Sequence, residues 1–182
     1  MIAYRLTLTQ MPHYTEPYRA IRLAAEKSGY WAERLRLLKA VRHSIHLAIF
    51  IEPYLTLLLQ GKKTVESRFS SVRCAPFQRV RTGDVVLIKR SGGPIVGICE
   101  VGQVWSYELD PSSWREIRRS FINELCAQDP DFWATRAHAS FATLMRVKNV
   151  VEVSPTAWIK RDRRGWVVVR EADQGNPCRS RQ

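Results

Sequence analysis

The chain has 182 residues, of which 45% are hydrophobic and 25% are charged. This composition is ordinary for a globular protein with a buried core, and it argues against wholesale disorder. Lys and Arg number 29 against 17 Asp and Glu, which gives a net charge of +12. A small domain is usually soluble with a net charge of about 2 to 8, so the excess favours a polyanionic partner, nucleic acid before an anionic membrane surface.

The first 43 residues predict a basic helical extension. The segment from Thr15 to His43 carries apolar residues at helical spacing and is interrupted at Lys27 to Gly29, so we expect one helix or two. Arginines and lysines fill many of the other positions. The apolar side of these helices should pack on the main domain. The basic side is then either only solvated or also a set of phosphate contacts.

Strand patterns begin at residue 44 and continue to residue 170. Glycines 97 and 102 interrupt one predicted strand and indicate a bend or a bulge. The predicted strands cover residues 44–50, 63–69, 83–90, 95–105 and 139–153, and a terminal hairpin over 156–170 turns between Asp162 and Gly165. The predicted helices cover residues 52–60, 110–126 and 129–137. Gly61 should end the first helix, and the second should have Asp110 or Ser113 as its cap and a capping box between Ser113 and Glu116.

Short strands joined by glycine turns, with helices inserted before the last strands, predict an α+β fold. We expect a small mixed β-barrel with inserted helices and an N-terminal helical extension. The predicted domains are a basic extension over 1–43, a main domain over 44–172 and a polar tail over 173–182. The sequence has no GxxxxGK[ST], no GxGxxG after a strand and no GxSxG, which argues against nucleotide hydrolases, dehydrogenases and serine hydrolases.

Cysteine and histidine spacing gives no sign of a metal site. The pair His43 and His46 lacks accompanying cysteines or carboxylates, so we predict no metal and no cofactor. The longest apolar run is broken by Glu52 and Pro53, and the first residues lack the pattern of a signal peptide. We therefore expect a cytoplasmic protein with no membrane segment. Its cysteines should be reduced thiols, and they stand at Cys74, Cys99, Cys126 and Cys178.

The segment EPYLTLLLQGKKTVESR, residues 52–68, places a burst of charge directly after a buried run. On a strand, Glu66 and Arg68 share one face and Ser67 takes the other. The two charged groups can pair, which keeps the carboxylate ionised. Lys63 is expected at the lip of that face, where it could fix a phosphate, read a base edge together with Glu66, or act as a general base when desolvated. The alternative is a purely structural pair beside two surface lysines.

The same segment resembles the signature of the ASCH domain family, a branch of the PUA-like superfamily. The pattern GxKxxExR falls on Gly61, Lys63, Glu66 and Arg68, and the resemblance extends over roughly residues 44–170. It implies a PUA-like barrel with a cleft between barrel and helices, in which relatives bind RNA or modified nucleosides. Some relatives hydrolyse the acetyl amide of N4-acetylcytidine, and others are described as ribonucleases.

One departure from the family pattern bears on catalysis. The resemblance implies that the amidohydrolase branch has threonine at the position of Glu66 and takes a glutamate from the inserted helical region. Glu124, Asp129 and Asp131 are candidates for that glutamate, and spacing does not choose among them. If the protein is an enzyme, the catalytic candidates are Lys63, Glu66 and Glu124. The departure at Glu66 favours binding over hydrolysis.

Aromatic and basic residues near strand ends complete the set of candidates. Most of the tryptophans should pack in the core, but Trp105 and Trp133 could line the cleft, where base stacking contributes about 1 to 3 kcal/mol per base. We expect residues 160–165 to form a basic hairpin tip that is either a backbone clamp or a solvated turn. The sequence thus predicts RNA or modified-nucleoside binding. The alternatives are an amidohydrolase of N4-acylated cytidines and, third, a ribonuclease or protein-interaction module.

Overall fold

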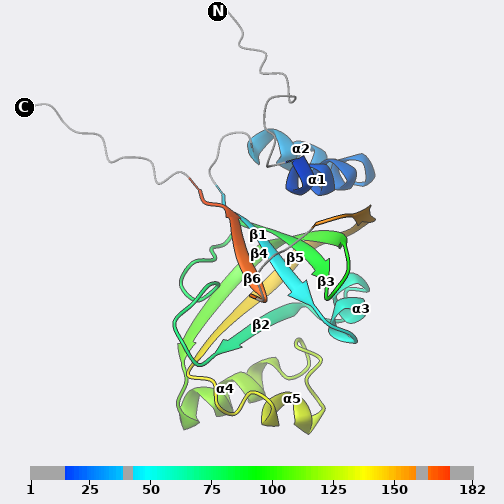
Figure 1. The fold of residues 1–182 in the computed structure, drawn as a ribbon. Coiled ribbons are helices and arrows are strands. Elements are labelled where there is room, and N and C mark those ends of the chain that lie inside the picture. Colours follow the sequence, from blue (N-terminus) through cyan, green and yellow to red (C-terminus); the bar gives the residue numbers. More distant parts are fainter. Residues whose placement is uncertain (1–14, 39–42, 159–163, 173–182) are drawn as a thin grey trace, which may run out of the picture.

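A computed structural model describes residues 15–38, 43–158 and 164–172 of the chain. It is a mixed α and β structure, as the sequence predicts, and the two N-terminal helices meet at the predicted break (Figure 1). In chain order the elements are α1 (Thr15–Lys27), α2 (Gly29–Leu38), β1 (Ile45–Phe50), α3 (Tyr54–Leu59), β2 (Val65–Ser70), β3 (Val85–Arg90), β4 (Ile95–Glu108), α4 (Pro111–Phe121), α5 (Pro130–Ala134), β5 (Phe141–Thr156) and β6 (Trp166–Arg170).

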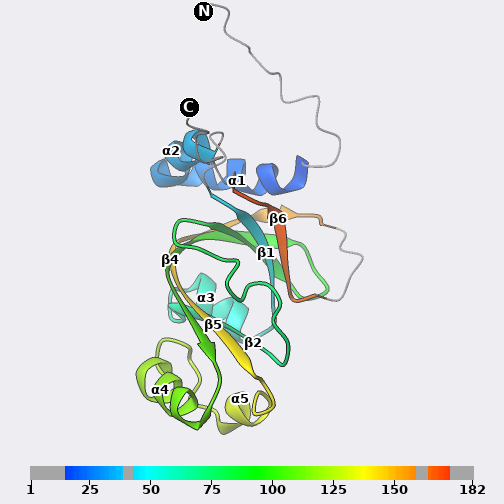
Figure 2. The same ribbon diagram turned by 90° about the vertical axis from the view of Figure 1, so that its left-hand side faces the viewer.

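The strands form one six-stranded sheet in the order β2-β5-β4-β3-β1-β6. Strands β1 and β3 run parallel, and the other neighbouring pairs are antiparallel. The sheet curls into a half-barrel, which confirms the predicted barrel-like fold (Figures 1 and 2). The long strand β4 shifts register between Ile95 and Gly97 and again between Val101 and Gln103, so the predicted bulges are present. Strands β2 and β6 are the two ends of this order.

The predicted terminal hairpin is wrong. Strand β6 pairs antiparallel with β1, and not with β5, the strand that precedes it in the sequence. The reason is the burial of Trp166, which is 4% exposed and donates from its indole nitrogen to the Nδ1 of His46 in β1. Residues 159–163, which include most of the predicted basic tip, lie outside the described residues.

Helices α1 and α2 share a hydrophobic core with the sheet. Ile21 and Trp31 are fully buried among residues of β1, β3 and β4. The Trp31 indole also donates to the Asn149 carbonyl at 2.8 Å. One basic residue of α2, Arg34, is buried as well, and its Nε lies 3.3 Å from the Glu100 carboxylate. The predicted packing of the helices on the sheet is thus confirmed, and Arg34 is part of that packing.

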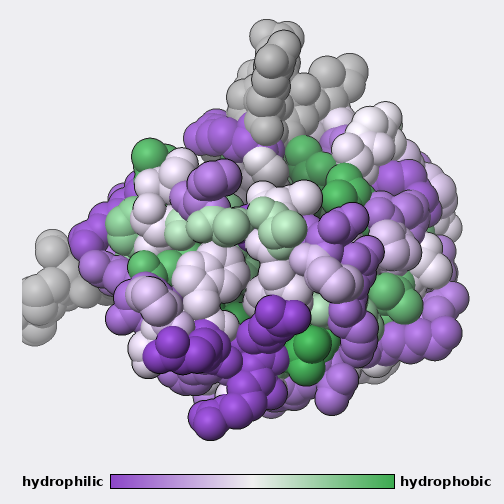
Figure 3. Space-filling view, turned by 90° about the horizontal axis from the view of Figure 1, so that it is seen from below, coloured by the Kyte–Doolittle hydropathy of each residue, from purple (hydrophilic) through white to green (hydrophobic). Residues whose placement is uncertain are grey.

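Helices α4 and α5 lie at the opposite end of the sheet from α1 and α2 (Figures 1 and 2). Helix α4 begins with a capping box between Asp110 and Ser113, and not with the predicted Ser113–Glu116 box, because the helix already starts at Pro111. It ends at Phe121, and turns replace the predicted helix over 122–126. Its exposed side carries Arg115, Arg118 and Arg119. Seen from below, this end of the molecule is largely hydrophilic with scattered hydrophobic residues (Figure 3).

The cysteines that the structure describes are free thiols: Cys74 is exposed, Cys99 is buried, and Cys126 is half-buried. Cys178 lies outside the described residues. Within the described ranges, no group of three or more His, Cys, Asp or Glu side chains could hold a metal ion. No helix of residues 15–38, 43–158 or 164–172 is both long enough and apolar enough to cross a membrane.

Candidate functional site

The signature segment leaves α3 through Gly61 and enters β2. Gly61 has a φ of +72° and follows Gln60, the C-cap of α3, so it occupies the left-handed C′ position that glycine favours, as predicted. The first residues of β2 are then held by the turn after α4. The backbone N–H groups of Thr64 and Val65 both donate to the Glu124 carbonyl, at 3.0 and 3.1 Å. Lys63 therefore lies between the end of α3 and the turn after α4, two segments that are far apart in the sequence.

Lys63 is buried, with only 2% of its surface exposed, and does not lie at the lip where the sequence placed it. Its Nζ donates to the carbonyls of Val65 at 2.6 Å and Leu125 at 3.4 Å. The same nitrogen lies 3.4 Å from a carboxylate oxygen of Glu66. Burial lowers the pKa of Lys63, and the Glu66 carboxylate opposes that shift. The Lys63 nitrogen therefore has three acceptors nearby, which are two backbone carbonyls and the Glu66 carboxylate.

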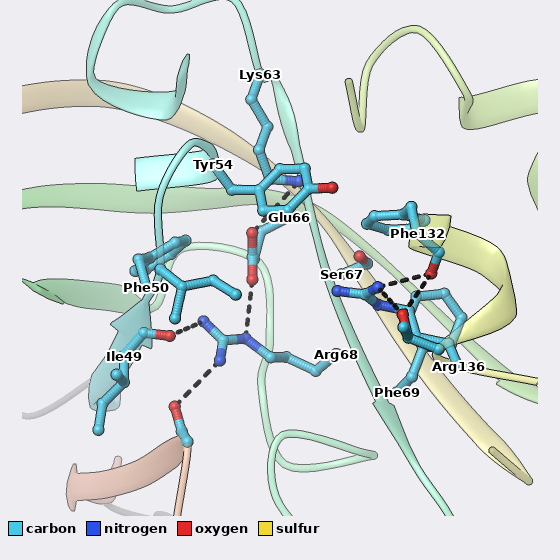
Figure 4. Close-up of a pocket in the computed structure, with 13 residues that line it drawn as sticks. Ile49, Phe50, Tyr54, Lys63, Glu66, Ser67, Arg68, Phe69, Phe132 and Arg136 are labelled. Carbon is cyan, nitrogen blue, oxygen red and sulfur yellow. Dashed lines mark hydrogen bonds and ion pairs between the residues drawn. The ribbon is translucent and has the colours of Figure 1, made fainter. Parts of the chain in front are cut away.

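Glu66 lies between Lys63 and Arg68, as Figure 4 shows. The Arg68 Nε is 2.8 Å from the second carboxylate oxygen of Glu66, so the pair predicted from their spacing is present. The two Nη atoms of Arg68 donate to the carbonyls of Ile49, at 2.9 Å, and Gly165, at 3.2 Å. Arg68 thus reaches from the end strand β2 to β1 and to the residue before β6. It bridges the open side of the half-barrel.

A buried hydrogen-bonded chain supports Arg68 from behind. The Arg68 guanidinium lies over the Trp166 ring, at 5.4 Å from the ring centre. The Trp166 indole N–H donates to the Nδ1 of His46 at 3.1 Å, and the Nε2 of His46 lies 3.0 Å from the Asp84 carboxylate. Because an indole nitrogen can only donate, His46 must accept at Nδ1 and donate from Nε2 to Asp84. This chain fixes the ring against which Arg68 rests.

A cavity of about 480 Å³ opens beside these residues and straddles the free edge of β2. Glu66 and Arg68 reach it from one face of the strand, and Ser67 and Phe69 reach it from the other. Ser67, which the strand pattern places on the face away from Glu66 and Arg68, is therefore part of the lining as well. The lining residues are Ile49, Phe50, Ile51, Tyr54, Lys63, Glu66, Ser67, Arg68, Phe69, Phe132, Thr135, Arg136 and Gly165.

Charge in the lining is unbalanced. Lys63, Arg68 and Arg136 are cationic and Glu66 is the carboxylate among the described lining residues, so with Lys63 protonated the net charge is +2. The lining also carries the rings of Tyr54 and several phenylalanines. A cavity of this kind suits a ligand that combines an anionic group with a flat apolar part.

The other residues predicted for the site take different places. The Glu124 carboxylate accepts from Arg146 at 2.7 Å, and the Trp133 indole donates to the Ala127 carbonyl at 2.8 Å. Trp105 packs edge-on against Phe121. Glu124, Trp105, Trp133 and Gly61 are not among the described residues that line the cavity. Their ligand or catalytic roles stay predictions.

Three lining residues outside the signature were not predicted from the sequence. Tyr54 comes from α3, and Phe132 and Arg136 come from α5 and the turn after it. The Arg136 guanidinium lies 3.9 Å from the centre of the Phe132 ring. Burial lowers the pKa of Arg136, while the Tyr54 hydroxyl and the Glu66 carboxylate oppose the shift. The sequence offers only the four-residue spacing of Phe132 and Arg136, and nothing in it links them to the signature.

Comparisons with known proteins agree with this fold. No curated protein matches the chain. The structure of ASCH from Zymomonas mobilis is similar, with 12% identity over 70% of this chain and 88% of that chain and a TM-score of 0.57. A serine-to-alanine mutant of the Zymomonas mobilis protein gives 10% identity over 72% of this chain and 92% of that chain, at a TM-score of 0.57. At such identities the likeness shows the fold alone. A family model of the ASCH domain matches residues 49–139, half of the 182 residues. The chain therefore belongs to the ASCH domain family.

Proposed function

We propose that this protein binds RNA or a modified nucleoside in the cavity beside β2. The observation that carries the proposal is the composition of the lining, in which three cations and one carboxylate meet aromatic rings. The ASCH domain is a PUA-like fold associated with RNA binding. Cations attract the phosphate backbone, and aromatic rings stack on bases, so the two features together favour a nucleotide-like ligand.

Glu66 is the proposed reader of the base. Each of its carboxylate oxygens faces one cation, Lys63 at 3.4 Å and Arg68 at 2.8 Å. A carboxylate oxygen has two lone pairs, so each retains room to accept a further hydrogen bond. An ionised glutamate accepts from the exocyclic amino group of cytosine. The two cations hold the Glu66 carboxylate in a fixed orientation for that task.

Lys63 acts through Glu66 in this proposal. Its Nζ is buried and already directed at two carbonyls and at Glu66, so it offers little to a phosphate that enters the cavity. Substitution by alanine should weaken RNA binding because Glu66 loses one of its two supports. Lys63 is therefore a positioning residue, and Glu66 makes the contact.

A binding titration separates base reading from plain charge attraction. Replacing Glu66 by Gln makes the cavity more positive by one unit, so an electrostatic binder would gain affinity. If Glu66 reads cytosine, Glu66→Gln instead loses about 1 to 3 kcal/mol with a cytidine-rich single strand. Fluorescence anisotropy of a short labelled RNA at two salt concentrations measures this. Glu116→Gln, an exposed change of the same kind on α4, is the matched control. Equal or tighter binding by Glu66→Gln rules out the assigned role.

Hydrolysis of an N4-acylated cytidine is the second candidate, and one observation favours it. Burial lowers the pKa of Lys63, which brings the neutral amine that a general base requires closer to neutral pH. Against it, the Glu124 carboxylate is directed at Arg146. Incubation of the pure protein with N4-acetylcytidine tests it, because water would release acetate and cytidine. No cytidine at high protein concentration excludes that substrate.

A further inference from the structure

Arg136 lies on the opposite side of the cavity from the signature residues. Two contacts hold its Nη1 in place, because it donates to the Phe132 carbonyl at 2.6 Å and to the Thr135 hydroxyl at 3.0 Å. The guanidinium also stacks on the Phe132 ring, at 3.9 Å from the ring centre. The side chain is half-buried, and these contacts fix its plane in the wall of the cavity.

The remaining edge of this guanidinium has donors to spare. The Nε and Nη2 atoms of Arg136 have no hydrogen-bond partner among the residues that the structure describes, whereas Arg68 uses both of its Nη atoms. Figure 4 shows the guanidinium beside Ser67, whose hydroxyl also lacks a hydrogen-bond partner in the described part of the chain. The Glu66 carboxylate in the lining is already paired with Lys63 and Arg68.

A guanidinium edge beside a hydroxyl, in a cavity with excess positive charge, is suited to phosphate. The two parallel N–H groups match two phosphate oxygens, and the hydroxyl can donate to a third. We propose that Arg136 and Ser67 form a phosphate subsite, so that the occupant is a nucleotide unit and not a free nucleoside. The inference rests on the proposed function, because it places the base at Glu66 and the phosphate across the edge of β2.

Calorimetric titration with cytidine and with cytidine 5′-monophosphate tests the subsite. We expect the wild-type protein to bind the nucleotide about 10- to 100-fold more tightly than the nucleoside. Arg136→Gln should bring that ratio of affinities close to one, because the variant loses affinity for the nucleotide and keeps its affinity for cytidine. Arg136→Lys should keep part of it, because lysine retains the charge without the fork. Arg115→Gln on the exposed side of α4 removes the same charge at a distance and should keep the wild-type ratio.

Ser67→Ala provides a second variant that leaves every charge in place. It should lower affinity for the nucleotide about 3- to 10-fold and leave affinity for cytidine unchanged. If wild-type protein binds both compounds equally, and Glu66→Gln weakens both, the subsite is wrong while the proposed function stands. If neither compound binds and the RNA titration is also flat, the subsite and the proposed function fail together. If Arg136→Gln weakens both compounds equally, the residue supports the cavity and does not bind phosphate.

Discussion

Replacing Glu66 by Gln leaves Lys63 as a buried ammonium group without its carboxylate partner. The two side chains are 9% and 2% exposed, and their charged atoms are 3.4 Å apart. With an effective dielectric constant of about 20, Coulomb attraction at this distance is about 5 kcal/mol, which is an upper bound on the loss. The carbonyls of Val65 and Leu125 still accept from the amine. We therefore expect the free energy of unfolding to fall by about 3 kcal/mol at neutral pH, typical of a broken buried pair.

The pH dependence of this loss follows from the direction of the lysine shift. Burial lowers the pKa of Lys63 below 10.5, so between the two pKa values the unfolded chain binds more protons than the folded chain. Stability from this residue therefore rises with pH in that window. Removing Glu66 removes an opposing influence and lowers the pKa of Lys63 further. The destabilisation by Glu66→Gln should be largest near neutral pH and shrink as the solution approaches about pH 10.

Urea denaturation followed by tryptophan fluorescence measures this effect. Glu66→Gln, Lys63→Met and the double variant form a cycle, and we expect the double variant to lose about 2 kcal/mol less than the sum of the single losses. Glu116→Gln serves as the exposed control and should change stability by less than about 0.5 kcal/mol. A loss below about 0.5 kcal/mol for Glu66→Gln at neutral pH, or additive single losses, would refute the buried pair.

Three further predictions concern the framework around the site. Trp166→Phe keeps a ring beside Arg68 but leaves the buried Nδ1 of His46 without its donor, so urea denaturation should show a loss of about 1 to 3 kcal/mol, and an unchanged midpoint would count against the hydrogen bond. Ile21→Ala should lower the free energy of unfolding by about 2 to 5 kcal/mol, and a loss under about 1 kcal/mol would mean that α1 does not share the sheet's core. A thiol reagent should modify exposed Cys74 in the native protein and Cys99 only after unfolding, because Cys99 is buried and burial raises its pKa. Mass spectrometry of the labelled peptides measures this, and equal rates of modification of the two cysteines in the native protein would contradict it.

Local features of the signature were predictable from the sequence. Gly61 ends α3 because only glycine adopts a positive φ at no steric cost, and the spacing of Glu66 and Arg68 follows from strand geometry. The burial of Lys63 was not predictable, because the Leu125 carbonyl that accepts from it is 62 residues away in sequence. The lysine lies in a closed environment only after the turn that follows α4 packs against β2.

Contacts between residues far apart in the sequence determine the features of the fold and the cavity that were not predicted. Strand β6 pairs with β1 because Trp166 meets His46 across 120 positions of sequence, whereas the turn signals suggested a local hairpin. Arg136 reaches the cavity because Phe132 and Ile117 bury α4 and α5 against β2 and β5. No spacing rule connects these residues to the signature. The part of the cavity wall that Phe132 and Arg136 form was therefore not predicted.

A crystal structure of the complex with cytidine 5′-monophosphate would show directly whether the cavity beside β2 binds a nucleotide. We expect the cytosine amino group to lie within hydrogen-bond distance of Glu66, with the phosphate on Arg136 and Ser67 at the other side of β2. A nucleotide bound elsewhere, for example on the exposed arginines of α4, with the cavity beside β2 unoccupied at saturating concentration, would contradict it.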